Sequence, residues 1–536
     1  MIAPELGSLP LDLKEKIDAI LAKRRGPVAI ACLDRVTGRS WELDGERAFA
    51  AGQLSALPLL MHAYETAQDD ALDWEALRPL LHRTVAECNG EAITQLAGRL
   101  SQSEAGTLTA RALLERLAAL DAHHPLWELL AWEGDRTKFP RRLSGVPMAY
   151  KAADRCELQL AHAAGRLGAS GDVLLVILTE GDPAANSLIG RLAKVIWDYH
   201  QDQLDQARRQ AEALEALRAQ GLPDRRLGLC EVQVTWKDGN LCVTGETTLP
   251  ESWFSTLDAV VAVEHLRGEP VRVIAPVLNL RREPRHGAEL VSQAPHGTPL
   301  TLLKRPEGEW FRVQTPDGYV AWGRSDNLSP EPIGEEGLRT LPIVLAAQRQ
   351  DGGGTVPLAA GSELRIRERE AGRWLAETAL GDAVWIPESE AIAAPDRPML
   401  WQDASTLGAR AVAIAEGWLG IPYLWGGKSG WGLDCSGLTQ LVYELLGLRL
   451  PRDADQQAKA LPAVPRWEEL VPGDLLFYPG HVALWAGEGA VIHASSPRGG
   501  VVREAVAQVP WLRERCTSLA RPAQARPALP HPHKPF

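Results

Sequence analysis

The chain has 536 residues, a formal net charge of −12, and 45% hydrophobic and 24% charged residues. This length exceeds what one hydrophobic core supports, so we expect about three to five domains, with the composition of a soluble globular protein. The negative charge argues against nucleic acid or an anionic membrane as the partner.

Residues 1–225 are expected to form an α/β domain. GPVAIACLDRVTGRSWELDGERAFAAG predicts two strands joined by a Thr-Gly turn, and AITQLAGRL and TARALLERLAAL predict amphipathic helices. A later strand, DVLLVILTEG, precedes the helix NSLIGRLAKVIWDYHQ. Strands before and after a helical block resemble the layout of a class A β-lactamase or penicillin-binding transpeptidase.

That family needs a serine three residues before a lysine, whose amine helps to deprotonate the hydroxyl, and Ser-x-x-Lys occurs nowhere in this chain. If AFAAGQLSALPLL aligns with the nucleophile helix, Gln53 replaces the serine and Ala56 the lysine. Residues 87–89 and 163–165 then stand in for Ser-Asp-Asn and Lys-Thr-Gly. We expect a degenerate, non-catalytic domain that docks on the peptidase described below, although Asn89 could line a peptide groove.

Residues 226–262 are expected to be a connector. QARRQAEALEALRAQG predicts a charged helix that leads into it, and EVQVTWKDGNLCVTGETTL predicts a hairpin that turns at Asp238 and Gly239. Neither pattern indicates a function.

Two small β-barrels are expected at residues 263–332 and 333–397. The first has short strands with regular turns, and its motifs NLRREP and DGYVAW resemble those of bacterial SH3-type barrels. A looser copy follows in TVPLAAGSELRIREREAGRWLAETALGDAVWIPESEAI.

Residues 398–520 hold the residue with the clearest chemistry, Cys435 in WGLDCSG. Asp434 and Ser436 are residue types that cap helices, and apolar residues recur at helical spacing through SGLTQLVYELLG until Gly447. Cys435 is therefore expected at a helix N-terminus. There the free N–H groups and the helix dipole favour a thiolate and could hold an oxyanion.

Two histidines follow on predicted strands of an antiparallel meander, DLLFYPG, HVALWAG and GAVIHAS. Neighbouring strands could bring His481 and His493 together, one as a base and the other to orient it. A zinc site made of these histidines and Cys435 is the alternative, but no paired Cys-x-x-Cys or His-x-x-x-His spacing accompanies them, so we expect no metal and no cofactor. The remaining cysteines are expected to be inert packing residues: 32, 88, 156, 230, 242 and 516.

This segment resembles the NlpC-type cell-wall peptidases, which are papain-like cysteine enzymes with a circularly permuted order of helix and sheet. The matching motifs are PYLWGG, DCSG, LPRDADQQ, PGDLLFY and the two histidines. The resemblance implies that Cys435 is the nucleophile, His481 the general base and His493 the orienting residue. It also implies that Tyr423 is a polar group beside the oxyanion site.

Two barrels before such a domain resemble the γ-D-glutamyl-L-diamino acid endopeptidases of murein-peptide recycling, in which the first barrel helps to form the cleft. By this resemblance Asp453 holds the free amino group of an L-Ala-γ-D-Glu unit, and Tyr319 faces the cleft. A helix cap is the alternative role for Asp453. Ala454 and residues 296–298 depart from the family pattern, which leaves the fine specificity open.

The sequence therefore predicts a multidomain α+β cysteine endopeptidase of murein peptides, with a flexible Pro-rich tail at residues 521–536. The predicted substrate-binding residues are Asp453, Asp434, Trp425, Tyr319 and Ser436. The absence of a basic and apolar leader, and a thiol that must stay reduced, favour the cytoplasm, with a wall or periplasmic location still open. A wall-binding protein and another papain-like amidase or acyltransferase are the alternatives.

Overall fold

The computed structural model describes residues 7–525, with gaps at 69–73, 88–89, 101–106, 132, 134, 156–158, 306–307, 331–336, 341–343 and 394–403. Cys88 and Asn89 and the end of the Pro-rich tail therefore lie outside the described residues. The chain forms two compact units. The first comprises residues 1–217, 232–245 and 254–263, and the second comprises residues 218–231, 246–253 and 264–536.

A five-stranded antiparallel sheet with the order β2-β1-β7-β6-β5 organises the first unit. Its strands are β1 (Val28–Asp34), β2 (Ser40–Leu43), β5 (Met148–Arg155), β6 (Leu160–Leu167) and β7 (Val173–Thr179). Successive side chains of a strand point to opposite faces. Ala29 and Ala31 of β1 accordingly pack into the core on one face, and Val28 and Ile30 into the core on the other.

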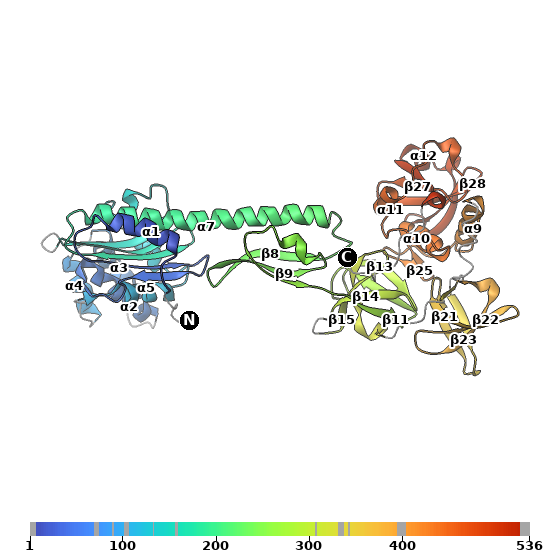
Figure 1. Cartoon of the computed structure of the whole chain (residues 1–536), viewed down its shortest axis with the longest axis horizontal. Helices are drawn as coiled ribbons and strands as arrows, with labels where there is room; N and C mark the ends of the chain where they lie inside the picture. The colour runs from blue at the N-terminus through green and yellow to red at the C-terminus, as the bar shows by residue number, and fades with distance from the viewer. Residues whose placement is uncertain are drawn as a thin grey trace. The chain divides into compact units, whose positions relative to one another are not determined.

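Helices cover both faces of this sheet (Figure 1). One face packs against a block inserted between β2 and β5: β3 (Phe49–Ala50), α2 (Ala56–Gln68), α3 (Trp74–Val85), α4 (Gly90–Arg99), β4 (Thr107–Leu108), α5 (Ala110–Ala119) and α6 (Leu126–Leu130). The other face packs against α1 (Leu11–Leu21) and α7 (Ala185–Gly221). Strands before and after a helical block are what the sequence predicts for this region.

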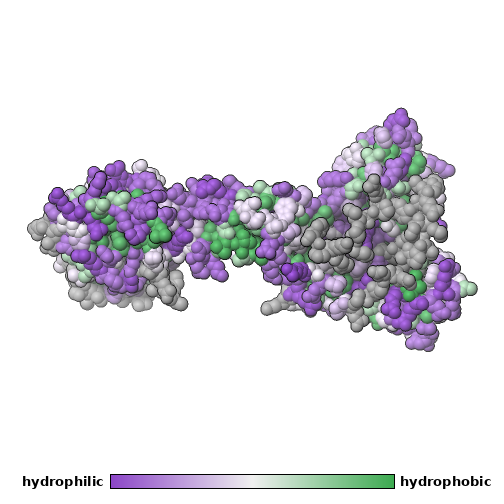
Figure 2. All heavy atoms as spheres, viewed as in Figure 1, coloured by the Kyte–Doolittle hydropathy of each residue, from purple (hydrophilic) through white to green (hydrophobic). Residues whose placement is uncertain are grey.

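Helix α7 has 37 residues, so the predicted helix and the predicted charged connector are one continuous element. Its buried side chains end at His200 except for Leu214, and hydrophilic residues cover the later turns (Figure 2). The charged side chains of these later turns face water, and the turns do not need to pack against a hydrophobic core. No helix in the described part of the chain is both long enough and apolar enough to cross a membrane.

The residues aligned with the β-lactamase motifs lie on two strands of the sheet and the turn beside them. Residues 163–165 lie on the interior strand β6, whereas Gln53 accepts a hydrogen bond from the backbone of Asp154 on the edge strand β5 (3.4 Å). The 3-10 turn that holds Gln53 (Gly52–Ser55) contacts both β6 and β5, so the alignment of residues 163–165 stays a prediction. Strand β5 carries the buried Lys151, which pairs with Glu133 at 2.9 Å.

The predicted hairpin forms β8 (Cys230–Lys237) and β9 (Asn240–Thr247), joined by β10 (Val260–His265) in a three-stranded sheet. At its turn Asp238 and Gly239 both have positive φ, 50° and 74°, as a two-residue turn between twisted strands requires.

Two barrels follow in the second unit, each with its own hydrophobic core. The first has β11 (Glu269–Val273), β12 (Val277–Arg281), β13 (Leu290–Pro295), β14 (Pro299–Lys304), β15 (Trp310–Gln314), β16 (Val320–Arg324) and β17 (Leu328–Ser329). The second has β18 (Gly337–Thr340), β19 (Val344–Arg349), β20 (Thr355–Ala359), β21 (Glu363–Glu370), β22 (Arg373–Glu377), β23 (Ala383–Pro387) and β24 (Ala391–Ala393). The strand orders, β13-β12-β16-β15-β14-β11-β17 and β20-β19-β23-β22-β21-β18-β24, trace the same path. The looser second copy predicted from the sequence is therefore present.

The C-terminal part of the second unit packs helices on a five-stranded sheet of order β30-β29-β28-β27-β31. Its elements are α9 (Ala404–Glu416), β25 (Lys428–Ser429), β26 (Gly432–Leu433), α10 (Cys435–Leu445), α11 (Ala454–Ala460), β27 (Leu475–Tyr478), β28 (His481–Gly487), β29 (Ala490–Ser495), β30 (Gly500–Ala505), α12 (Trp511–Glu514) and β31 (Ser518–Ala520). Leu438 and Val442 of α10 share one core with Leu475 and Ile492 of the sheet. This packing presents the first turn of α10 to the start of β28.

Candidate active site

Cys435 is the first residue of α10, and only 7% of its surface is exposed. Asp434 caps the helix by accepting a hydrogen bond from the N–H of Gly437 at 2.6 Å, so the predicted helix start is confirmed. The backbone N–H groups of Ser436 and Val482 face the sulfur. Because Val482 follows His481 on β28, the thiol lies beside the strand that carries the first histidine.

Burial controls the protonation of this pair. Together with the Asp434 carboxylate, it raises the pKa of the Cys435 thiol to about 11. Burial also lowers the pKa of His481 to about 4, and His493 contributes in the same direction. Burial therefore opposes the thiolate that the helix N-terminus favours, and the expected thiolate stays a prediction.

Three neighbouring strands carry a hydrogen-bonded relay. His481 Nε2 on β28 lies 2.8 Å from His493 Nδ1 on β29, and His493 Nε2 lies 2.9 Å from Glu504 Oε2 on β30. The other oxygen of Glu504 accepts a hydrogen bond from Arg498 Nε at 2.8 Å. His493 is fully buried, so the relay runs through the interior of the sheet.

This relay fixes where the protons sit. An ionised carboxylate only accepts, so Glu504 places the His493 proton on Nε2 and leaves its Nδ1 as an acceptor. His481 must then donate from Nε2, which leaves its own Nδ1 with a free lone pair. Since the relay occupies Nε2, Nδ1 is the His481 atom that can take the thiol proton.

Glu504 was missed in the sequence. The register pairs it with Val491 across β29 and β30, and Val491 lies two residues from His493, on the same face of the strand. An acidic residue in VVREA, the strand that follows VIHAS, was the available signal. Using it requires the register, which the sequence alone does not supply.

The Asp434 carboxylate is occupied inside the protein. Arg452, which is 1% exposed, makes two hydrogen bonds to it, at 2.6 and 3.1 Å, and the N–H of Gly426 makes a third at 2.9 Å. Arg452 also donates to the hydroxyl groups of Ser436 and of Ser292 in the first barrel, each at 3.0 Å. Asp434 and Ser436, predicted to bind substrate, are thus buried supports of the nucleophile turn.

The other predicted site residues fall in different surroundings. Tyr423 is half-buried, and its pKa is raised to about 12 by burial and then by Cys435. Trp425 is 63% exposed and donates from Nε1 to Glu289 of the first barrel at 3.0 Å. Tyr319 is 6% exposed and packs in the core of that barrel. Burial and then the negative charge of Asp453 raise its pKa to about 12, so the Tyr319 hydroxyl lies within electrostatic reach of that carboxylate.

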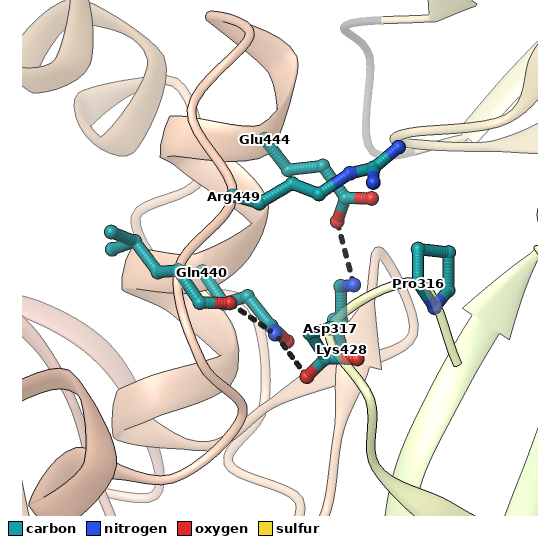
Figure 3. A pocket seen from close by; sticks show the side chains of 7 residues that line it. Pro316, Asp317, Lys428, Gln440, Glu444 and Arg449 are labelled. Carbon is teal, nitrogen blue, oxygen red and sulfur yellow. Dashed lines mark hydrogen bonds and ion pairs between the residues drawn. The ribbon is translucent and has the colours of Figure 1, made fainter. Parts of the chain in front are cut away.

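A small crevice lies where the first barrel contacts α10 (Figure 3). Gln440, on the second turn of α10, donates to Asp317 of the barrel at 2.9 Å. Beside it, Lys428 and Glu444 form an ion pair at 2.6 Å. The hydrogen bond between Gln440 and Asp317 therefore holds the barrel loop that carries Tyr319 against α10. Cys435 does not line this crevice.

Asp453 is the N-cap of α11, as the alternative role anticipated. Burial raises its pKa, and the positive charges of Arg452 and Arg226 oppose that effect. Arg226, from the connector, places its guanidinium 2.7 Å from Asp453 Oδ2. No pattern in the sequence pointed to this partner. Within the described residues, no group of three or more His, Cys, Asp or Glu side chains is arranged to hold a metal ion.

Comparison with known proteins identifies two of the domains. A family model described as the NlpC/P60 family matches residues 420–520, and one described as the bacterial dipeptidyl-peptidase SH3 domain matches residues 280–328. Among solved structures, an NlpC/P60 family protein from Bacillus cereus covers 47% of this chain and 99% of its own, with 18% identity and a TM-score of 0.42. A β-lactamase from Chitinophaga pinensis covers 35% of this chain and 99% of its own, with 14% identity and a TM-score of 0.32.

Two curated relatives match over most of their length. A gamma-D-glutamyl-L-lysine dipeptidyl-peptidase of Bacillus subtilis (strain 168) is 30% identical over 218 residues, which are 37% of this chain and 70% of the relative. Dipeptidyl-peptidase 6 of Lysinibacillus sphaericus is 30% identical over 240 residues, 42% of this chain and 86% of the relative. With a cysteine at the start of a helix and two histidines in line beside it, the chain belongs to the NlpC/P60 family of cysteine-type peptidases.

Proposed function

We propose that this peptidase hydrolyses the bond between γ-D-glutamate and the diamino acid of cell-wall (murein) peptides, with a preference for peptides that have a free N-terminal L-Ala. The printed name of the Bacillus subtilis relative supports the substrate class. The observation that carries the chemistry is the relay from Glu504 to His481, which leaves one imidazole nitrogen as a proton acceptor on the residue before Val482, whose backbone N–H faces the buried thiol.

The reaction begins as the thiol proton of Cys435 moves to His481 Nδ1 while the sulfur attacks the glutamyl carbonyl carbon. The carbonyl oxygen becomes an oxyanion that the backbone N–H groups at the start of α10 can stabilise, with Tyr423 close by. The imidazolium gives its proton to the leaving amine, and the C–N bond breaks to leave a thioester. Water then attacks the thioester, His481 accepts its proton and returns it to sulfur, and the γ-D-glutamyl product leaves as a carboxylic acid.

Asp453 is the proposed anchor for the substrate's ammonium group. Its carboxylate follows Arg452 directly in the chain, and Arg452 contacts the Asp434 that precedes the nucleophile. Tyr319 of the first barrel lies within electrostatic reach of the same carboxylate. A charge-assisted hydrogen bond between an ammonium and such a partly buried carboxylate would fix the peptide's N-terminus relative to the sulfur.

The test is mass spectrometry of L-Ala-γ-D-Glu-diaminopimelate and of its N-acetylated form after incubation with the protein, with Cys435→Ala as the inactive control. We expect release of the dipeptide L-Ala-D-Glu from the free-amine substrate only. Equal cleavage of both peptides would contradict the amine preference. Cleavage of neither, with free lactyl ends released from intact murein, would identify an amidase instead.

A further inference from the structure

A segment of the connector lies along the first barrel and is held there by its backbone. The N–H of Val320 donates to the carbonyl oxygen of Arg226 at 2.7 Å, and Gln314 Nε2 donates to that of Leu227 at 3.0 Å. Gln456 of α11 adds a hydrogen bond to the Asp224 carboxylate at 2.7 Å. The segment therefore has anchors on both the barrel and the peptidase that do not involve the Arg226 side chain.

The Arg226 guanidinium is surrounded by three carboxylates. It contacts Asp453 Oδ2 at 2.7 Å, both oxygens of Asp455 at 2.9 Å, and Asp224 at 2.7 and 2.8 Å. The Arg226 side chain keeps 33% of its surface exposed, and Asp453 keeps 29%. This is a partly exposed cation site, and a side chain of the same protein fills it.

Arg226 and the substrate's ammonium would need the same carboxylate. Each is a cation with N–H donors, and Oδ2 of Asp453 already accepts from the guanidinium. A group that binds an occupied site has its apparent affinity lowered by the fraction of time for which the site is free. An acylated N-terminus has no charge to compete with Arg226 and does not need this carboxylate.

We propose that Arg226 is a specificity-determining residue that stands in for the substrate's N-terminal ammonium at Asp453. The inference rests on the proposed function, because it assumes that Asp453 receives that ammonium. It adds that the connector weakens the preference for free-amine peptides. The Arg226 side chain moves aside on binding while the backbone of its segment stays on the barrel.

The experiment compares the full chain with its Arg226→Ala and Arg226→Lys variants on the tripeptide and its N-acetylated form. Arg226→Ala is expected to lower KM for the free-amine peptide about tenfold with little change in kcat, and to leave the acetylated peptide unaffected. Arg226→Lys retains the cation and is expected to stay close to the wild type. Arg466→Ala is the matched control, since it removes an exposed arginine paired with Glu469 in the same domain.

A small cation provides a second readout. Millimolar ethylguanidinium should refill the site in Arg226→Ala, restore the wild-type KM for the free-amine peptide, and leave the acetylated peptide unaffected. An unchanged or raised KM in Arg226→Ala overturns the inference while the proposed function stands. Cleavage by the variant alone supports a complete block by Arg226, and cleavage by neither protein overturns both proposals.

Discussion

Replacing Glu504 by glutamine tests whether the relay sets the proton on the base. The amide has nearly the shape of the carboxylate but can present N–H as well as C=O to His493 Nε2. When it donates, the His493 proton moves to Nδ1, and His481 must then accept at Nε2 and carry its own proton on Nδ1. That tautomer cannot take the proton of Cys435.

The size of the effect follows from the lost hydrogen bond. The His493 to Glu504 contact is 2.9 Å long and lies in a largely buried place, where a hydrogen bond to a charged group contributes about 1.5–3 kcal/mol. Losing that preference for the productive tautomer lowers kcat by about 10- to 100-fold. KM should change little, because Glu504 is not expected to contact the substrate.

The assay measures kcat and KM on the free-amine tripeptide, together with the imidazole nitrogen chemical shifts, which report the tautomer directly. Arg498→Gln is the control, since it removes the more exposed partner of the same carboxylate and should cost about threefold or less. A Glu504→Gln enzyme with kcat within about twofold of the wild type and unchanged nitrogen shifts would refute the relay.

Three further outcomes are expected. The acid limb of kcat/KM should fall near pH 4 rather than 6.5, because the pKa of His481 is lowered to about 4; a limb near 6.5 would show that the imidazole is hydrated. The same shift should make the free energy of unfolding rise with pH between about 4 and 6.5, by about 3 kcal/mol in total. In that range His481 is protonated in the unfolded chain and neutral in the folded one. Urea titrations at several pH values measure this change. Arg452→Met should cost about 3–5 kcal/mol by leaving Asp434 buried without its partner, and a second change, Asp434→Asn, should recover most of that loss; additive losses would contradict the pairing.

The local chemistry of the nucleophile turn was predictable from short motifs. The capping residue Asp434, the apolar spacing of the helix and the glycine that ends it define α10 without reference to the rest of the chain. The hairpin at Asp238 and Gly239 was predictable for the same reason, because two-residue turns demand particular residue types.

Features that depend on tertiary structure were not predictable in this way. The protonation of Cys435 depends on its burial, which no sequence motif encodes, and the place of Glu504 depends on strand register. Arg226 meets Asp453 across 227 positions of sequence, so only the folded second unit brings the two together. Asp434 was predicted to bind substrate, but its carboxylate accepts two hydrogen bonds from Arg452.

The last member of the relay lies on β30, which is the outermost strand in the order of its sheet. Besides pairing with β29, its first residues, Gly500 and Val501, pair with the backbone of residues 420–422, whereas Glu504 lies towards its other end. Edge strands lose their hydrogen bonds at a lower free energy than central ones, so they open while the rest of a domain stays folded. Heating should therefore abolish catalytic activity at a lower temperature than the one at which the domain unfolds. Turnover would decline while the circular dichroism still reports an intact fold, and cooling from that stage would return full activity, since only the outermost strand has to pair again.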